Sequence, residues 1–253
     1  MAIIAGADPS TAARLGLAMV ALQASIGALN DLVDAPADAG RKPGKPIPAG
    51  LVSVGAARVA TAVAAGLGLL LTMPSGPLAV ALAVAILAIG YGYDLLAKGT
   101  AWSWLPFALG IPFLPVFAWL GAGERLPSAF LLLLPAAVAA GAALAIANSS
   151  ADLERDEAAG VESVATRLGR DRAWALEAAL LAVVVLVAMA SLWLHGVSTP
   201  VEAASVGAAF VIAVGLAVGR RAAQARRQRA WELQAIGVAL LAATWLAGFA
   251  EAR

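Results

Sequence analysis

Eight long apolar segments limit this chain to very few folds. Each has about 20 residues, enough for an α-helix to cross the hydrocarbon core of a bilayer. Only helices and closed barrels satisfy their backbone groups in lipid, and unbroken apolar runs such as 78–90 lack the alternation of barrel strands. The sequence therefore predicts an all-α integral membrane protein, a bundle of eight transmembrane helices. The expected helices span 11–34, 53–73, 76–96, 102–122, 128–150, 171–195, 200–218 and 229–249.

Composition excludes several classes of function. With 62% hydrophobic and 13% charged residues, the chain lies outside the range of soluble domains. It has no cysteine, which excludes disulfides and thiolate chemistry. Its one histidine, His195, ends an apolar segment, where an interfacial position is favoured over a zinc site. A net charge of +1 argues against a nucleic acid as partner.

The polar gaps between the segments are too short for a separate soluble domain. We therefore expect one membrane-embedded domain over residues 1–253. Its halves, 11–122 and 128–249, each contain an asparagine and aspartates at the end of a predicted helix, followed by a basic loop with glycine. This likeness indicates an internal duplication.

The basic residues lie almost entirely on one side of the predicted bundle. Of the 17 lysines and arginines, only Arg14, Arg125 and Arg253 fall on the other side. Because cytoplasmic loops are enriched in Lys and Arg, the basic side is expected to face the cytoplasm. We thus predict a protein of the cell inner membrane that also contacts its lipids. The loops on the cytoplasmic side are 35–52, 97–101, 151–170 and 219–228.

Seven of the 16 acidic residues crowd into two short windows beside these loops. In a helix of 3.6 residues per turn, residues four apart stay on one face. Asn30, Asp34 and Asp38 have this spacing, although Pro36 is expected to kink or unwind the segment before Asp38. Asn148, Asp152 and Asp156 repeat the spacing on the fifth predicted helix. The seven acids are Asp31, Asp34, Asp38, Asp152, Glu154, Asp156 and Glu157.

These two carboxylate groups predict a magnesium site. Facing carboxylates repel one another strongly at low dielectric unless cations neutralise them. Mg²⁺ prefers oxygen ligands and is usually held by one or two carboxylates together with substrate phosphates. At a membrane surface this points to an enzyme acting on a diphosphate whose remainder is dissolved in lipid. The expected metal ligands are Asn30, Asp31, Asp34, Asp38, Asn148, Asp152 and Asp156, of which Asp31, Asp34, Asp152 and Asp156 are the expected catalytic residues.

Basic residues near both groups complete the predicted site. Lys and Arg bind phosphate and stabilise the charge that develops on a departing diphosphate. The expected diphosphate contacts are Lys42, Lys45, Lys98 and Arg167. The basic run from Arg220 to Arg229 is interpreted differently, as a topology signal that contacts anionic lipid.

Two motifs resemble those of the UbiA superfamily of intramembrane prenyltransferases. The first family motif, N-D-x-x-D-x-x-x-D, is matched by Asn30, Asp31, Asp34 and Asp38. The second, D-x-x-x-D, is matched by Asp152 and Asp156. Three further segments are similar to family sequences around these motifs: 42–50, 93–98 and 160–169.

The resemblance implies a reaction and a fold. It implies a helical bundle around a central cavity, in which a polyprenyl group passes from a prenyl diphosphate to a small acceptor through an allylic carbocation. It also implies two Mg²⁺ ions bridging to the diphosphate, one held by Asn30, Asp31 and Asp34 and the other by Asp152 and Asp156. Lys45, Lys98 and Arg167 would contact the diphosphate.

One departure from the family pattern lies at the beginning of the chain. Family members usually have nine helices, with one complete helix before the helix that carries the first motif. In this chain that motif begins at residue 30, and residues 1–6 read like the tail of a missing helix. We therefore expect the first helix of the family to be missing from this sequence.

Two other functions stay open at this point. A cation-coupled transporter would also use intramembrane carboxylates, although the aspartates here gather at one face. A non-catalytic family member would keep the fold without the reaction; the short beginning of the chain favours it and the intact motifs argue against it.

Overall fold

The computed structural model describes residues 1–40, 44–220 and 223–251, and the regular elements within these ranges are all helical. Eight of the described helices are long and apolar enough to cross a membrane. The predicted all-α membrane fold is therefore confirmed. The observed spans begin and end within a few residues of the predicted ones; the fifth, for example, is Phe130–Ala151 against a predicted 128–150.

Two compact units make up the chain. The N-terminal unit contains Ala2–Lys98 and Phe113–Arg125, and the C-terminal unit contains Met1, Gly99–Pro112 and Leu126–Arg253. Helix α4 (Trp104–Gly121) contributes its first half to the C-terminal unit and its second half to the N-terminal unit. The predicted single domain and its internal duplication stay predictions.

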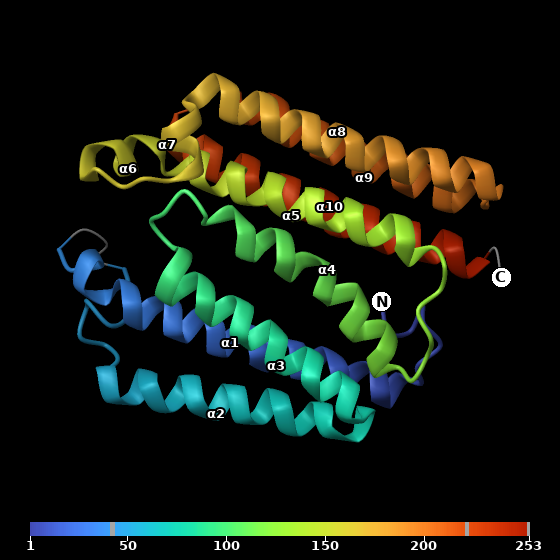
Figure 1. Ribbon diagram of the computed structural model, residues 1–253, viewed down its shortest axis with the longest axis horizontal. Coiled ribbons are helices and arrows are strands. Elements are labelled where there is room, and N and C mark those ends of the chain that lie inside the picture. Colours follow the sequence, from blue (N-terminus) through green and yellow to red (C-terminus); the bar gives the residue numbers. More distant parts are fainter. Residues whose placement is uncertain (41–43, 221–222, 252–253) are drawn as a thin grey trace. The chain divides into compact units, whose positions relative to one another are not determined.

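Three long helices lie side by side in the N-terminal unit (Figure 1). They are α1 (Pro9–Asp38), α2 (Val54–Thr72) and α3 (Pro77–Gly92). A short 3₁₀ turn, η1 (Met73–Ser75), follows α2, and a π-helical turn, η2 (Tyr93–Ala97), extends α3. Small residues let α1 and α2 approach closely, because a Cβ on Gly68 would lie only 2.7 Å from Leu22 Cδ2 and 3.2 Å from the Ala18 carbonyl oxygen.

Four long helices lie side by side in the C-terminal unit (Figure 1). They are α5 (Phe130–Ala151), α8 (Arg170–His195), α9 (Thr199–Gly219) and α10 (Gln224–Glu251). The short helices α6 (Leu153–Ala159) and α7 (Val164–Leu168) connect α5 to α8. In the most apolar stretch of α5, 61% of the residues are buried, against 33% in α8, 22% in α9 and 44% in α10, so α5 is the most buried helix of its unit.

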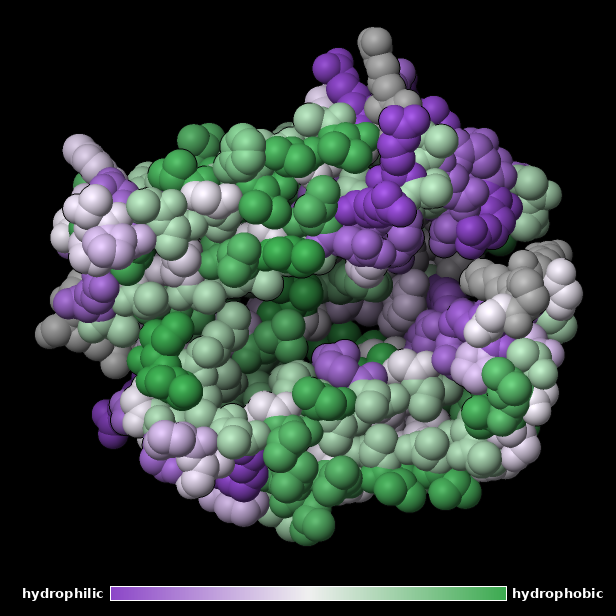
Figure 2. Space-filling view, turned by 180° about the vertical axis from the view of Figure 1, so that it is seen from behind, coloured by the Kyte–Doolittle hydropathy of each residue, from purple (hydrophilic) through white to green (hydrophobic). Residues whose placement is uncertain are grey.

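The outer helix faces are hydrophobic, as a membrane requires. Figure 2 shows apolar side chains covering these faces, with hydrophilic side chains gathered toward helix ends. Large residues such as Leu131, Phe210 and Val20 are among the most exposed. Exposing such large apolar surfaces to water would cost free energy, but in lipid these surfaces need no protein partner.

Two local expectations were wrong. Pro36 does not unwind the end of α1, which continues to Asp38. The proline lies in the last turn, where few backbone hydrogen bonds remain to be lost, and the Ala39 amide still bonds to the Ala35 carbonyl at 3.2 Å. The fifth helix, in turn, ends at Ala151, so Asp156 lies on the separate helix α6 and not on α5.

Candidate active site

The first group of predicted residues lies in the last turns of α1. Because α1 is continuous through Pro36, the predicted shared face of Asn30, Asp34 and Asp38 is realised. Asp38 is buried, whereas Asp31 and Asp34 are partly exposed. The carboxylates therefore lie at one end of the helix.

Each of the two partly exposed aspartates is paired with one of the predicted lysines. Lys98 Nζ lies 2.6 Å from both Oδ atoms of Asp34, across 64 residues of sequence. Lys45 Nζ pairs with Asp31 Oδ1. The hydrogen bond to Asp31 raises the pKa of Lys45, and the negative charges of Asp31 and neighbouring aspartates outweigh the opposite effect of burial.

The loop after α1 positions Lys45. Backbone hydrogen bonds of 3.0 Å, from the Ala49 amide to the Lys45 carbonyl and from the Gly50 amide to the Ile47 carbonyl, close residues 45–50 into a compact turn. Gly50 has a φ of 72°, which other residues rarely adopt. Lys42, also predicted to contact a diphosphate, lies outside the described residues.

Asp94 is a member of this group that sequence reasoning missed. It lies in η2 with 3% of its surface exposed, and Asn30 Nδ2 donates to its Oδ1 at 2.7 Å. A carboxylate only accepts, so this contact turns the amide nitrogen of Asn30 toward Asp94 and leaves the amide oxygen as the free acceptor. Its burial and its place in a π-helical turn, a feature that is frequent at functional sites, are visible only in the structure.

The second group lies at the joint between α5 and α6. Asp152 follows the last residue of α5, and Arg155 Nη1 lies 3.0 Å from its Oδ1. Gln224 Nε2 donates to the same oxygen at 3.5 Å. Asn148 is half-buried one turn before Asp152. This group therefore has partners on α6 and α10 that hold Asp152 in place.

Asp156 lies one turn further along, on α6. Burial raises the pKa of its carboxyl, and the nearby charge of Asp152 adds to this rise, while a hydrogen bond with Ser163 opposes it. The negative charge of Asp152 beside the carboxyl of Asp156 favours a cation between them.

Arg167 is not paired with the carboxylates of either group. Its Nη2 lies 3.0 Å from Glu162 Oε2, and 62% and 70% of the two side chains are exposed. Arg167 belongs to α7, which begins with a capping box between Ser163 and Thr166.

These observations, two motif-bearing carboxylate groups on a membrane helical fold, agree with a family comparison. A model of the UbiA prenyltransferase family matches residues 1–248. The chain belongs to the UbiA prenyltransferase family. The predicted family and the predicted enzyme class, a prenyltransferase in the membrane, are therefore confirmed. None of the curated proteins matches the sequence.

Solved structures of UbiA homologues share the fold. The apo homologue of Aeropyrum pernix K1 has a TM-score of 0.78 and 20% identity, over 96% of this chain and 92% of that one. The homologue of Archaeoglobus fulgidus bound to DMAPP and Mg²⁺ has a TM-score of 0.67 and 20% identity, over 95% and 92%. A digeranylgeranylglyceryl phosphate synthase structure has a TM-score of 0.72 and 17% identity, over 99% and 92%.

The donor set of the first UbiA motif fits a magnesium ion. Asn30, Asp31 and Asp34 offer only amide and carboxylate oxygens, the ligands that Mg²⁺ prefers. Within the described ranges, no three acidic or histidine side chains lie close enough together to hold a metal ion by themselves. Lys45 and Lys98 form ion pairs with the carboxylates of Asp31 and Asp34. A substrate diphosphate would supply the remaining oxygen ligands of the metal ion. The predicted roles of the site residues stay predictions.

A second set of residues missed by sequence reasoning lies beside the second group. Arg227, with 5% of its surface exposed, donates from Nε to the Ser150 carbonyl oxygen at 2.8 Å and pairs with Glu154, as Arg170 does. Burial alone would raise the pKa of Glu154, but hydrogen bonds from its own amide and from Arg227, with the charge of Arg170, lower it. The interpretation of the Arg220–Arg229 run as mostly a topology signal stays a prediction; Arg227, within that run, also links α10 to the joint between α5 and α6.

Proposed function

We propose that this chain transfers a polyprenyl group from a prenyl diphosphate to a small acceptor in a Mg²⁺-dependent reaction. One observation carries the proposal: oxygen ligands for Mg²⁺ and cations for phosphate lie together at the end of α1. Asp31 and Asp34 supply the oxygen ligands, and Lys45 and Lys98 supply the positive charges. The Archaeoglobus fulgidus homologue bound to DMAPP and Mg²⁺ supports the same assignment.

The residues of the first group bind and hold the diphosphate. Mg²⁺, when bound by Asn30, Asp31 and Asp34, would neutralise diphosphate charge and make it a better leaving group. Lys45 and Lys98 exchange one anionic partner, an aspartate, for another, the diphosphate. Their positive charge stabilises the electron pair that leaves with the bridging oxygen when the bond to the allylic carbon breaks. The acceptor then forms a bond to that carbon and loses a proton.

The second group serves the same reaction in this proposal. Asp152 and Asp156, with Asn148 one turn before Asp152, would hold a second Mg²⁺ ion. Arg155 and Gln224 hold Asp152 at the joint between α5 and α6. Arg167, Lys42 and Asp38 complete the set of proposed ligands, as the family motifs imply.

The proposed orientation places both groups at the cytoplasmic face of the cell inner membrane. The excess of Lys and Arg on that side supports it. The diphosphate end of the donor would then lie at the cytoplasmic surface and the released diphosphate would leave into the cytoplasm, while the prenyl chain stays in the membrane.

Turnover by the purified protein tests the proposal. The chain is placed in liposomes and offered radiolabelled prenyl diphosphates of several chain lengths, with pooled acceptor extracts, with and without Mg²⁺. We expect a labelled lipid product only with Mg²⁺, and its mass identifies the acceptor. Equilibrium binding of the same donors is measured in parallel. Absence of both product and Mg²⁺-dependent donor binding would leave a non-catalytic family member as the better description.

A further inference from the structure

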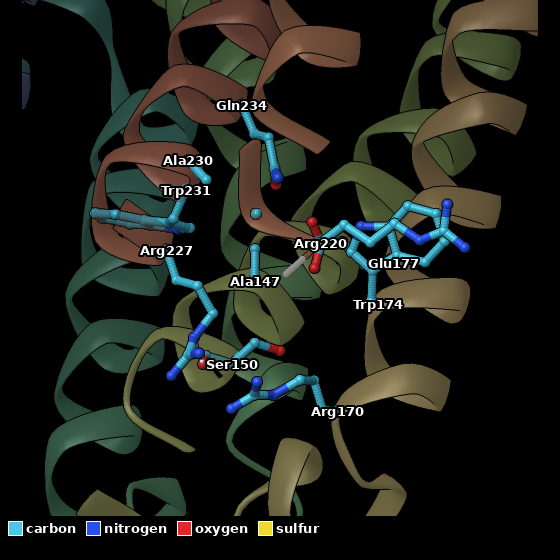
Figure 3. Close-up of a pocket in the computed structure, with 11 residues that line it drawn as sticks. Ala147, Ser150, Arg170, Trp174, Glu177, Arg220, Arg227, Ala230, Trp231 and Gln234 are labelled. Atoms are coloured by element: carbon cyan, nitrogen blue, oxygen red, sulfur yellow. Dashed lines mark hydrogen bonds between the residues drawn. The ribbon is translucent and has the colours of Figure 1, made fainter. Parts of the chain in front are cut away.

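A polar pocket lies inside the C-terminal unit, between the ends of α5, α8, α9 and α10 (Figure 3). Three arginines reach it from three helices, and two tryptophans and three other polar side chains complete its lining. The polar and aromatic lining residues are Ser150, Arg170, Trp174, Glu177, Arg220, Arg227, Trp231 and Gln234.

The pocket is distinct from the second carboxylate group. Successive residues of a helix turn by about 100°, so Ser150 lies on roughly the opposite side of α5 from Asn148. Arg170, Trp174 and Glu177 follow at helical spacing along one face of α8, and Arg227, Trp231 and Gln234 do so along α10. Their spacing could have been found in the sequence, but nothing in it says that the two faces meet.

Several buried polar atoms of the pocket lack a partner in the described part of the chain. They are the indole nitrogen of Trp231, the hydroxyl oxygen of Ser150 and the amide oxygen of Gln234. Gln234 has only 2% of its surface exposed, and Glu177 lines the same pocket. Such atoms are costly unless a ligand or water satisfies them. The indole and the hydroxyl donate hydrogen bonds, and the amide oxygen accepts one.

The charge of the pocket is positive. Arg170 and Arg227 share Glu154 between them, and Glu177 is the only acid in the lining within the described residues. Arg220 lies with its guanidinium carbon 4.6 Å from the ring centroid of Trp174, which orients the guanidinium. Three arginines against two glutamates leave the pocket with an excess of positive charge, which favours an anion.

The position of the pocket suits a phosphate. It lies at the helix ends that the charge distribution assigns to the cytoplasmic surface, the level of lipid headgroups, where basic pockets between transmembrane helices bind them. The first amides of α8, beside Arg170, have no side-chain cap and favour an anion. We propose that this pocket binds a singly charged phosphate that also carries a hydroxyl group, from a lipid headgroup or in solution. The hydroxyl donates to Gln234, and Arg220 with Trp231 and Ser150 binds the phosphate oxygens.

The experiment measures which phosphate the pocket takes. The full-length protein is placed in nanodiscs of phosphatidylcholine with increasing phosphatidylglycerol, which has a singly charged phosphate and hydroxyls, and its melting temperature and retained lipids are measured. A second arm titrates inorganic phosphate into protein in neutral detergent. Stabilisation by phosphatidylglycerol shows a headgroup site, and stabilisation by phosphate alone shows a site for the free anion. No binding in either arm, or equal stabilisation by pure phosphatidylcholine, would overturn the proposal.

Variants separate the pocket from general surface charge. Arg220→Gln removes the guanidinium, and Trp231→Phe removes only the indole donor; each is expected to weaken binding, the first by about tenfold because it removes a charge-assisted contact. Arg229→Gln is the matched control, since Arg229 is exposed on α10 outside the pocket. An equal loss in the control, or no loss in both pocket variants, contradicts the assignment. The readout is ligand binding, so it stands apart from prenyl transfer.

Discussion

The two carboxylate groups are built in different ways. In the first, Asp31 and Asp34 lie on one continuous helix and their lysines come from two other segments, the loop after α1 and the residue after η2. In the second, Asp152 lies where a helix ends, and its salt-bridge partner Arg155 comes from the next turn of the same segment. The ion pairs of the first group therefore join separate segments, whereas the ion pair of Asp152 is local and only its longer hydrogen bond from Gln224 comes from another long helix. Substitutions in the two carboxylate groups should show whether this difference in construction affects turnover.

The largest effect is expected when one carboxylate is removed from each group. Asp34→Ala and Asp152→Ala should each lower turnover at least about 100-fold, because each removes a direct metal ligand in the proposed site. Membrane insertion and melting temperature should change little. Asp171→Ala, at an exposed acid in the first turn of α8, is the control. Near-normal turnover in only the Asp152 variant would show that the second group has no part in the reaction.

The sequence was sufficient for the fold and for part of the first group. Crossing a membrane demands long uninterrupted apolar segments, so hydropathy alone locates eight helices. Lys45 and Lys98 were predicted as phosphate ligands, and the structure pairs them with Asp31 and Asp34.

Other residues were beyond sequence reasoning for physical reasons. Asp94 is a single acid 64 residues from Asn30, and only the packing of α3 beside α1 makes it a partner. Arg227 belongs to a run of arginines that resembles a loop, and its burial depends on Glu154 and Ser150, which are distant in sequence. The end of α5 at Ala151 could not be predicted because no glycine or proline, the usual signals of a helix end, occurs there.

A smaller loss is expected from the contact that orients Asn30. Asp94→Leu removes the acceptor for Asn30 Nδ2, so the amide can rotate and its oxygen is no longer fixed. Partners behind metal ligands typically contribute about 10- to 100-fold, and we expect a loss in that range in apparent Mg²⁺ affinity. The measurement is turnover, together with donor binding, as a function of Mg²⁺ concentration. Asp94→Glu, which keeps an acceptor, should recover part of the affinity; a loss of activity that excess Mg²⁺ does not restore would contradict a positioning role.

Two arginines near the second group should differ in their effect on stability. Arg227→Gln leaves the Ser150 carbonyl and Glu154 short of a partner beside the joint, and a lost buried contact of this kind costs about 1–3 kcal/mol. Arg167→Gln breaks only an exposed pair, which contributes about 0–1 kcal/mol. Thermal unfolding in lipid compares them. If Arg167→Gln keeps its melting temperature but loses turnover, its proposed contact with the diphosphate is supported; unchanged turnover would remove it from the site.

The smallest effect concerns the opposite end of α1. Asp8 caps this helix and accepts hydrogen bonds from the amides of Ser10 and Thr11 at 2.9 and 3.1 Å. The hydrogen bonds from Ser10 and Thr11 hold the pKa of Asp8 well below its ordinary value of 3.8. A carboxyl whose pKa is lower in the folded state stabilises that state at any pH above the pKa of the unfolded state. This stabilisation is lost as the pH falls through the pKa of the folded state. We therefore expect the melting temperature to decline slightly more below pH 3.8 in the unmodified protein than in Asp8→Ala.

The comparison of Asp8 with Asp34 separates two uses of a carboxylate on one helix. Asp8 is fully exposed and bonded to its own helix, so Asp8→Ala should lower stability slightly and leave turnover at saturating substrate unchanged. Asp34 is held by Lys98 from another segment and lies in the proposed site, so Asp34→Ala should abolish most of the turnover and change the stability little. Measuring turnover and melting temperature on both variants in the same lipid decides the matter. If Asp8→Ala were to reduce turnover as strongly as Asp34→Ala, the loss in both would reflect disturbance of α1, and the magnesium assignment would lose its main support.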